Sequence, residues 1–275
     1  MFATRVLSSV VIVIVALVTL LQGGYLLAAV LLTISIIAYN ELCNACKIHT
    51  QSQKVNALEC VGYLGIFAYY AIVVFGGSQT AQLLCILIML VAYMFVYVFT
   101  FPKYQAQQVM AAFFSFVYAP VMFSFIYLTR QMPYGICIVW MIFISSWICD
   151  SCAYLSGMLL GKHKLAPKLS PKKSVEGAIG GVLGSALVGG LFGYFVVETM
   201  ISEQQITFVF VIIGAIGAVI SQIGDLAASA IKRNHEIKDY GHLIPGHGGI
   251  MDRFDSVIFT APMIYALAVL LIEQM

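Results

Sequence analysis

Long apolar segments alternate with short polar ones along the whole chain. Most of the apolar segments approach the roughly 20 residues that a helix needs to cross a membrane. The pattern predicts an all-α fold, a polytopic integral membrane protein with about nine transmembrane helices. The predicted helices cover Val6–Leu21, Tyr25–Tyr39, Leu58–Phe75, Ala81–Phe101, Val109–Leu128, Tyr134–Leu155, Gly177–Val197, Ile206–Ile231 and Ser256–Ile272.

The composition agrees with this pattern. Charged residues make up 9% of the chain and apolar residues 61%, whereas a soluble domain carries about 25% charge. Such a chain can satisfy this imbalance only by placing most of its surface in lipid. The expected location is the cell inner (cytoplasmic) membrane, which the chain crosses several times.

The positive charges predict an orientation. Of the 14 Lys and Arg residues, only Arg130 falls on one side of a nine-helix arrangement, and the others fall on the opposite side. Because Lys and Arg concentrate in cytoplasmic loops, the N-terminus should be cytoplasmic and the C-terminus external. The polar motifs described below then lie at the cytoplasmic face.

Candidate chemistry is concentrated in the second half of the chain. Residues 1–130 are interpreted as a membrane-embedding half, and residues 131–275 as the half that carries the catalytic motifs, within one integral domain. The polar exception in the first half is Glu41, at the end of the second predicted helix, which we interpret as an interfacial residue. Four glycines of the seventh helix are typical of close helix packing; they are Gly177, Gly180, Gly181 and Gly184.

Three carboxylates are candidates for a metal site. Asp225 lies inside the eighth predicted helix, on a face of small and polar residues, and an ionised side chain at that depth usually faces a cavity or an ion. Asp252 and Asp255 are three residues apart at the start of the ninth helix, where they share one face. Mg²⁺ needs only one or two carboxylates when phosphates and waters supply its other ligands. Asp225 and Asp252 are therefore the predicted metal ligands, whereas helix capping is an alternative for Asp255.

Basic residues surround these carboxylates. Lys232 and Lys238 suit contact with a polyphosphate, although membrane anchoring explains a basic pair such as Lys232-Arg233 equally well. The loop Gly161–Gly177 carries Lys172 and Lys173 to the N-terminus of the seventh helix, where anions bind readily. Either Ser170 or Ser174 could cap that helix. Attraction to anionic lipids is the alternative for this loop.

Two blocks of sequence together resemble a known family. Ser229-x-Ile231-Lys232-Arg233, Lys238-Asp239-x-Gly241 and Pro245-x-His247-Gly248-Gly249-Ile250-x-Asp252-Arg253-Phe254-Asp255 resemble the diagnostic motif of phosphatidate cytidylyltransferases, also called CDP-diacylglycerol synthases. A second block, Asp150-x-x-Ala153-Tyr154 through Ser170-Pro171-Lys172-Lys173-Ser174-x-Glu176-Gly177, resembles another part of that family.

The resemblance implies a nucleotidyltransferase of phospholipid biosynthesis that converts CTP and phosphatidic acid into CDP-diacylglycerol and pyrophosphate. It implies Mg²⁺, with a second cation left open. The implied catalytic residues are Asp225, Lys232, Lys238, Asp252, Arg253 and Asp255. The implied substrate-binding residues are Asp150, Ser170, Lys172, Lys173, Ser174, Glu176, Arg233, Asp239, His247, Gly248 and Gly249.

Two other functions remain open at this point. A kinase or cytidylyltransferase that acts on a polyprenyl lipid would use similar groups, and a transporter also places charges in the membrane. Transporters usually show related halves and a midplane site, and no internal repeat is visible here. The expected partners are CTP, phosphatidic acid and the bilayer, not nucleic acid; a homodimer is left open.

Overall fold

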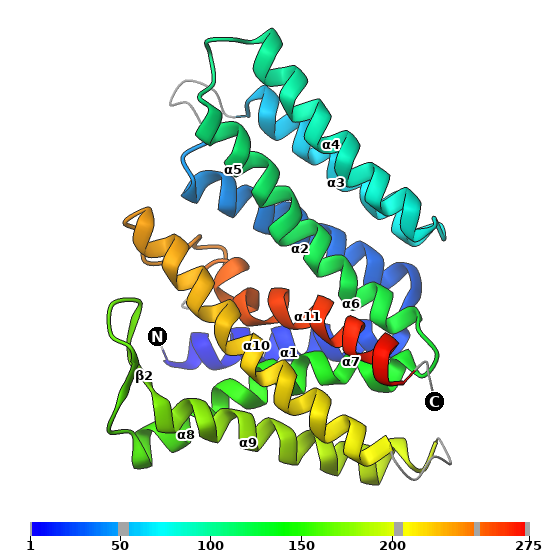
Figure 1. Cartoon of the computed structure of the whole chain (residues 1–275), viewed down its shortest axis with the longest axis vertical. Helices are drawn as coiled ribbons and strands as arrows, with labels where there is room; N and C mark the ends of the chain where they lie inside the picture. The colour runs from blue at the N-terminus through cyan, green and yellow to red at the C-terminus, as the bar shows by residue number, and fades with distance from the viewer. Residues whose placement is uncertain (1, 49–54, 201–205, 245–247, 273–275) are drawn as a thin grey trace. The chain divides into compact units, whose positions relative to one another are not determined.

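Helices account for nearly all of the computed structural model, which describes residues 2–48, 55–200, 206–244 and 248–272 (Figure 1). Within these described ranges, eight helices are long and apolar enough to cross a membrane. A further apolar helix is described over Val10–Gln22, within α1 (Phe2–Gln22). The predicted all-α polytopic fold with about nine transmembrane helices is confirmed. The eight spans are Gly24–Ala45, Ala57–Val74, Gln79–Phe99, Ala106–Gln131, Gly135–Leu160, Val175–Val197, Ile206–Asn234 and Met251–Leu271.

The chain forms two compact units. One comprises Met1–Tyr127 with His235–Arg253, and the other comprises Leu128–Asn234 with Phe254–Met275. The polar segment that follows the span Ile206–Asn234 therefore packs with the N-terminal helices, although it is distant from them in sequence. The N-terminal half has a part in holding this segment as well as in entering the membrane.

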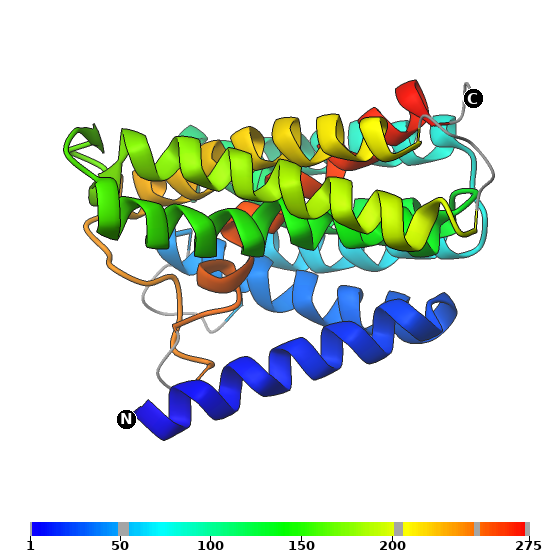
Figure 2. The ribbon, with the colours of Figure 1, turned by 90° about the horizontal axis from the view of Figure 1, so that it is seen from below.

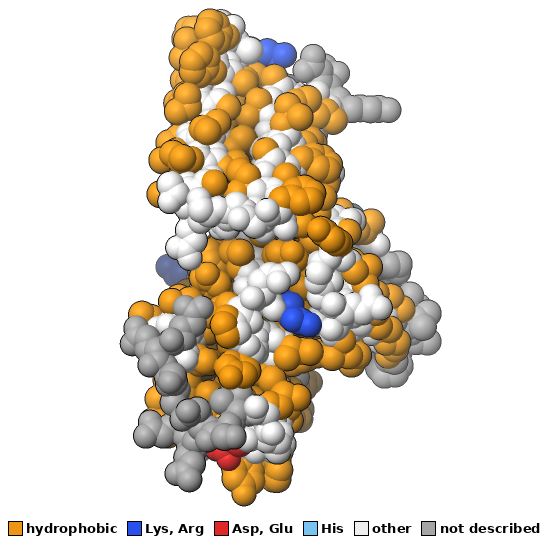
Figure 3. Space-filling model, turned by 90° about the vertical axis from the view of Figure 1, so that its right-hand side faces the viewer, with side chains coloured by type: hydrophobic (Ala, Val, Ile, Leu, Met, Phe, Trp, Pro, Cys, Tyr) orange, Lys and Arg blue, Asp and Glu red, His pale blue; other side chains and the backbone are white. Residues whose placement is uncertain are grey.

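The first unit contains α2 (Gly24–Ala45), α3 (Ala57–Val74), α4 (Gln79–Phe99) and α5 (Ala106–Phe116). Buried hydroxyl groups join these helices: the Tyr39 and Tyr93 oxygens are 3.0 Å apart, and those of Ser35 and Tyr70 are 2.7 Å apart. In lipid such groups must find partners within the protein. The outer side of α4 carries large apolar side chains, such as Leu83 and Phe95. Figure 3 shows one face of the molecule, where hydrophobic side chains predominate and charged ones are few.

The span Ala106–Gln131 is continuous through a proline. A π-helical turn, η1 (Val117–Val121), connects α5 to α6 (Met122–Gln131) and contains Pro120. Proline has no N–H to donate and its ring collides with the carbonyl of the preceding turn in a regular α-helix. The wider turn accommodates both defects, so the helix crosses without a break.

The second unit contains α7 (Gly135–Phe143), the π-turn η2 (Ile144–Ile148), α8 (Cys149–Leu160), α9 (Val175–Phe192), η3 (Gly193–Val197), α10 (Ile206–Asn234) and most of α11 (Met251–Leu271). Helix α9 packs against both α8 and α10, and the three run side by side in Figure 2. A Cβ atom built on Gly181 would lie 2.9 Å from the carbonyl oxygen of Cys149, so no larger residue fits without a shift. The packing interpretation of the α9 glycines is confirmed.

Candidate functional site

A short β-hairpin, which the apolar pattern did not predict, leads into α9. Its strands β1 (Lys164–Ala166) and β2 (Ser170–Ser174) are antiparallel, and β2 continues directly into the helix. Ser174 caps the helix, because its Oγ accepts the N–H of Gly177 at 3.1 Å. Of the two serines that the sequence offered as caps, the structure therefore selects Ser174.

Glu176 fixes the base of this hairpin. One carboxylate oxygen lies 2.6 Å from His163 Nδ1, and the other accepts the N–H groups of Lys162 and His163 at 3.1 and 3.2 Å. The backbone of Val175 also donates to the carbonyl of His163 at 2.9 Å. These contacts fix the direction in which the lysines of β2 leave the hairpin. The structure thus uses Glu176 to position its neighbours, and substrate contact by this residue stays a prediction.

An ion pair joins the hairpin to Asp225 of α10. Lys173 Nζ on β2 lies 2.5 Å from Asp225 Oδ2 on α10, with about a quarter of each side chain exposed (25% and 26%). Ser229, one turn further along α10, lies 3.4 Å from the other carboxylate oxygen of Asp225. Fifty-two positions separate Lys173 from Asp225 in the sequence, so the fold brings the lysines of the Asp150–Gly177 block to the carboxylate of α10.

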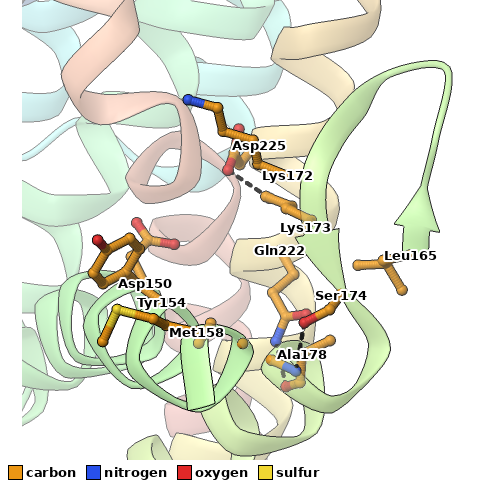
Figure 4. Close-up of a pocket in the computed structure, with 13 residues that line it drawn as sticks. Asp150, Tyr154, Met158, Leu165, Lys172, Lys173, Ser174, Ala178, Gln222 and Asp225 are labelled. Carbon is orange, nitrogen blue, oxygen red and sulfur yellow. Dashed lines mark hydrogen bonds and ion pairs between the residues drawn. The ribbon is translucent and has the colours of Figure 1, made fainter. Parts of the chain in front are cut away.

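A pocket of about 360 Å³ opens beside this ion pair. That volume lies within the range of small-molecule sites. Figure 4 shows Lys172, Lys173 and Asp225 on one side of the pocket, and Asp150, Tyr154 and Met158 of α8 on another. Five of the predicted site residues line it, namely Asp150, Lys172, Lys173, Ser174 and Asp225. A pocket that combines two lysines and two carboxylates with apolar groups such as Met158 and Leu165 suits an anionic ligand with an apolar part.

The sequence interpretation had not assigned a role to Gln222, which also lines the pocket. Its side-chain amide donates to the carbonyl of Ala178 on α9 at 3.0 Å. Gln222 lies three residues before Asp225, on the same side of α10. The sequence did contain a signal for Gln222. A glutamine in an apolar span, three residues from a candidate metal ligand, is expected to share its helix face.

Asp255 is near Asp225 in the second unit. A Cβ atom built on Gly224 would lie 3.0 Å from the carbonyl oxygen of Asp255, so α10 and α11 approach closely here. The charges of Asp225, Lys232 and Asp150 all act on the Asp255 carboxylate. Lys232 and Arg233 lie in the last turn of α10. The arrangement concentrates carboxylates and lysines at one end of this unit.

These groups suit a cation whose other ligands would come from the phosphates of a bound molecule and from water. Within the described residues, no group of three or more His, Cys, Asp and Glu side chains could hold a metal ion. Mg²⁺ is usually bound by one or two carboxylates together with phosphate and water oxygens. Asp225 and Asp255 are carboxylates of that kind, and lysines lie beside them; the predicted metal ligands Asp225 and Asp252 stay a prediction.

Apart from Ser170, the remaining predicted residues belong to the first unit or lie outside the described residues. Lys238, Asp239 and Arg253 are exposed there, whereas Asp252 is buried. Asp252 Oδ2 accepts two backbone N–H groups, from Tyr240 at 2.8 Å and from Gly249 at 3.0 Å. His247 lies outside the described residues, and Ser170 is in the hairpin without lining the pocket.

One expectation needs correction in this unit. Gly249 donates its N–H to Asp252, and Gly248 has a φ of 83°, which glycine adopts without strain; substrate contact by both glycines stays a prediction. Glu41 was interpreted as interfacial because the predicted helix ended at Tyr39. Helix α2 continues to Ala45, and Glu41 is buried with 7% of its surface exposed.

The amino-acid sequence of the chain matches a known protein family. The profile of the cytidylyltransferase family matches residues 3–271. The chain belongs to the cytidylyltransferase family. It is 30% identical to a phosphatidate cytidylyltransferase of Staphylococcus haemolyticus and 31% identical to one of Staphylococcus aureus, in both cases over 96% of this chain and 98% of the relative. A phosphatidate cytidylyltransferase of Haemophilus influenzae is 35% identical over 49% of this chain and 46% of its own length.

The hydrogen bonds of Glu176 at the base of the hairpin give a prediction for this member of the cytidylyltransferase family. Glu176→Ala should loosen the hairpin, because its charged hydrogen bonds to the backbone are lost. Loss of one such bond, about 1.5 kcal/mol, corresponds to about tenfold faster cleavage by a lysine-specific protease. Cleavage is measured by gel electrophoresis and peptide mass, in detergent. Glu198→Ala removes a carboxylate that accepts from Thr207 at the other end of α9 and serves as the control; equal rates in wild type and Glu176→Ala would contradict the anchoring role.

Proposed function

We propose that this protein transfers the cytidylyl group of CTP to phosphatidic acid, forming CDP-diacylglycerol and pyrophosphate for phospholipid biosynthesis. The observation that carries the proposal is the Lys173–Asp225 ion pair, which brings a lysine of the Asp150–Gly177 block and the carboxylate of α10 to one pocket. Membership of the cytidylyltransferase family supports the proposal. So does the match to a relative named phosphatidate cytidylyltransferase, which covers 98% of that relative. The pocket lies between helices long and apolar enough to enter a bilayer, which suits a lipid substrate.

The proposed reaction is an in-line displacement at phosphorus. A phosphate oxygen of phosphatidic acid attacks the α-phosphorus of CTP, a new P–O bond forms, and pyrophosphate leaves with the electrons of the broken bond. The nucleophile is already an anion, so the site needs no strong general base. The chain's contribution is to hold two anions in line and to stabilise the charge that develops on the transferred phosphoryl group.

Cationic side chains are proposed to hold the two anions. Lys172 and Lys173 reach the pocket from β2, and Lys232 acts on the same cluster of charges from the end of α10. Lys238 and Arg253 are proposed to contact the phosphates, as the family resemblance implies. The proposed substrate-binding role extends, on the same resemblance, to Asp150, Ser170, Ser174, Glu176, Arg233, Asp239, His247, Gly248 and Gly249.

A bound Mg²⁺ is part of the proposal, and a second cation is compatible with it. Asp225 and Asp252 are the proposed ligands, with Asp255 close to Asp225. When bound, the cation would neutralise the triphosphate and orient the leaving pyrophosphate. Asp225 itself holds Lys173, so the same carboxylate would position a lysine and a cation.

The active site is proposed to face the cytoplasm, with the N-terminus on the same side. This rests on the distribution of Lys and Arg and on the cytoplasmic source of nucleotides. In a cysteine-free background, Lys168→Cys in the hairpin and Lys238→Cys should escape an impermeant maleimide in intact cells, because both lie inside. Gln131→Cys should react from outside, and all three should react after permeabilisation. Labelling of Lys168→Cys in intact cells would overturn the orientation.

The reaction has a direct test. Purified protein with CTP, Mg²⁺ and phosphatidic acid in detergent micelles should release pyrophosphate and form CDP-diacylglycerol, measured by a coupled assay and by mass spectrometry. Diacylglycerol should not replace phosphatidic acid, because it has no phosphate nucleophile. A phosphorylated product from diacylglycerol at a similar rate would indicate a kinase, and turnover with a polyprenyl phosphate alone would indicate the other lipid class.

The carboxylates give the sharpest prediction about the site. Asp225→Asn and Asp252→Asn should each lower kcat at least about 100-fold, since charge neutralisation and orientation together contribute several kcal/mol to lowering the barrier. Asp255→Asn should lower it less, because Asn also caps helices. Glu198→Gln removes a charge away from the pocket and should keep its activity. Near-normal activity and Mg²⁺ dependence in either of the first two variants would contradict the assignment.

A further inference from the structure

The strongest unassigned feature is a buried carboxylate of the first unit, Glu41 on α2. Its two oxygens accept consecutive backbone N–H groups at the start of α11, Oε1 from Ile250 at 3.0 Å and Oε2 from Met251 at 2.8 Å. The first N–H groups of a helix have no partner within the helix, and a negative charge is favourable at that end. A residue 209 positions earlier in the chain therefore caps α11.

Two carboxylates together hold one stretch of backbone. Gly249 donates to Asp252, and the next two residues, Ile250 and Met251, donate to Glu41. Three successive N–H groups are thus directed by two side chains, one from α11 itself and one from α2. This arrangement fixes the backbone immediately before Asp252, and with it the direction of the Asp252 side chain.

The surrounding glycines are shaped to the same carboxylate. A Cβ atom built on Gly249 or on Gly241 would overlap the carboxylate of Glu41. Both glycines belong to the motif shared with the family, whereas Glu41 lies outside it. The close approach gives a physical reason for these two glycines that does not involve contact with a ligand.

We infer that Glu41 is a positioning residue, which holds the Gly249–Asp252 segment in its working geometry from the N-terminal half of the chain. The inference rests on the proposed function, because that function makes Asp252 a ligand of the reacting complex. Glu41 acts through the backbone and does not need to touch either substrate. Loss of its two hydrogen bonds leaves buried N–H groups unpaired, so the segment shifts, and Asp252 shifts with it.

The chain offers a matched control. Glu59 on α3 is also a buried glutamate of the first unit, and it caps its own helix, with Oε2 accepting the N–H of Asn56 at 2.9 Å. It belongs to neither motif. A purely structural role for Glu41 predicts that Glu41 and Glu59 variants behave alike, whereas a positioning role predicts that they differ in turnover.

The experiment measures the apparent thermal midpoint in detergent, kcat and the KM for CTP for Glu41→Gln, Glu41→Ala, Glu59→Gln and Glu59→Ala. All four should lower the midpoint. Only the Glu41 pair should lower kcat of the folded protein, by roughly 10- to 100-fold as expected for a misplacement of about 1 Å. Glu41→Gln should be the milder, since its amide oxygen can still accept one N–H. Wild-type kcat in Glu41→Gln, or an equal loss in Glu59→Gln, would overturn the inference.

A second measurement does not depend on the reaction. Gly249→Ala should lower the thermal midpoint in the wild-type background, because its Cβ meets the Glu41 carboxylate, and much less in a Glu41→Ala background, where that carboxylate is absent. Equal losses in both backgrounds would refute the contact, whatever the protein catalyses. If the wild type shows no turnover of CTP with phosphatidic acid while this coupling is present, the proposed function fails and the structural role of Glu41 stands.

Discussion

The ion pair between Lys173 and Asp225 is the interaction on which the pocket depends. A charged side chain within a membrane helix costs about 2.5–3.5 kcal/mol on insertion scales, and a partner of opposite charge offsets part of that cost. The partner here comes from a hairpin that reaches the end of α10. The hairpin in turn is held by Glu176 and by the Ser174 cap of α9. Each of these contacts therefore contributes to keeping a carboxylate at the edge of an apolar helix.

In the first unit, buried carboxylates are stabilised by hydrogen bonds from backbone N–H groups. There the buried carboxylates of Glu41 and Asp252 each accept two backbone N–H groups. Hydrogen bonds to an ionised acceptor are stronger than neutral ones, and the N-terminal end of α11 adds a favourable dipole. The backbone order of this segment and the negative charge of its carboxylates are therefore maintained together.

Hydropathy was sufficient to predict the spans, because lipid requires every spanning segment to be a long apolar helix. The motif residues of the pocket were also predictable, since Asp225 and the lysines of β2 are polar residues that an apolar region does not need. The hairpin was not, because its strands are short, rich in lysine and lacking in apolar alternation. The role of Glu41 was hidden for another reason: it depends on a contact across 209 positions, which no local pattern encodes.

In helix α9, side-chain size distinguishes the face that packs against other helices from the face that does not. Its inward positions are glycine and serine and its outward ones are isoleucine and leucine, yet both faces are uncharged, so polarity hardly distinguishes them. Volume does: the small residues recur every four positions, and so do the large ones. Adding one methyl group on the inner face is therefore a larger disturbance than exchanging one large aliphatic side chain for another outside. The inner positions are Gly177, Gly181, Ser185 and Gly189, and the outer ones are Ile179, Leu183, Leu187 and Leu191.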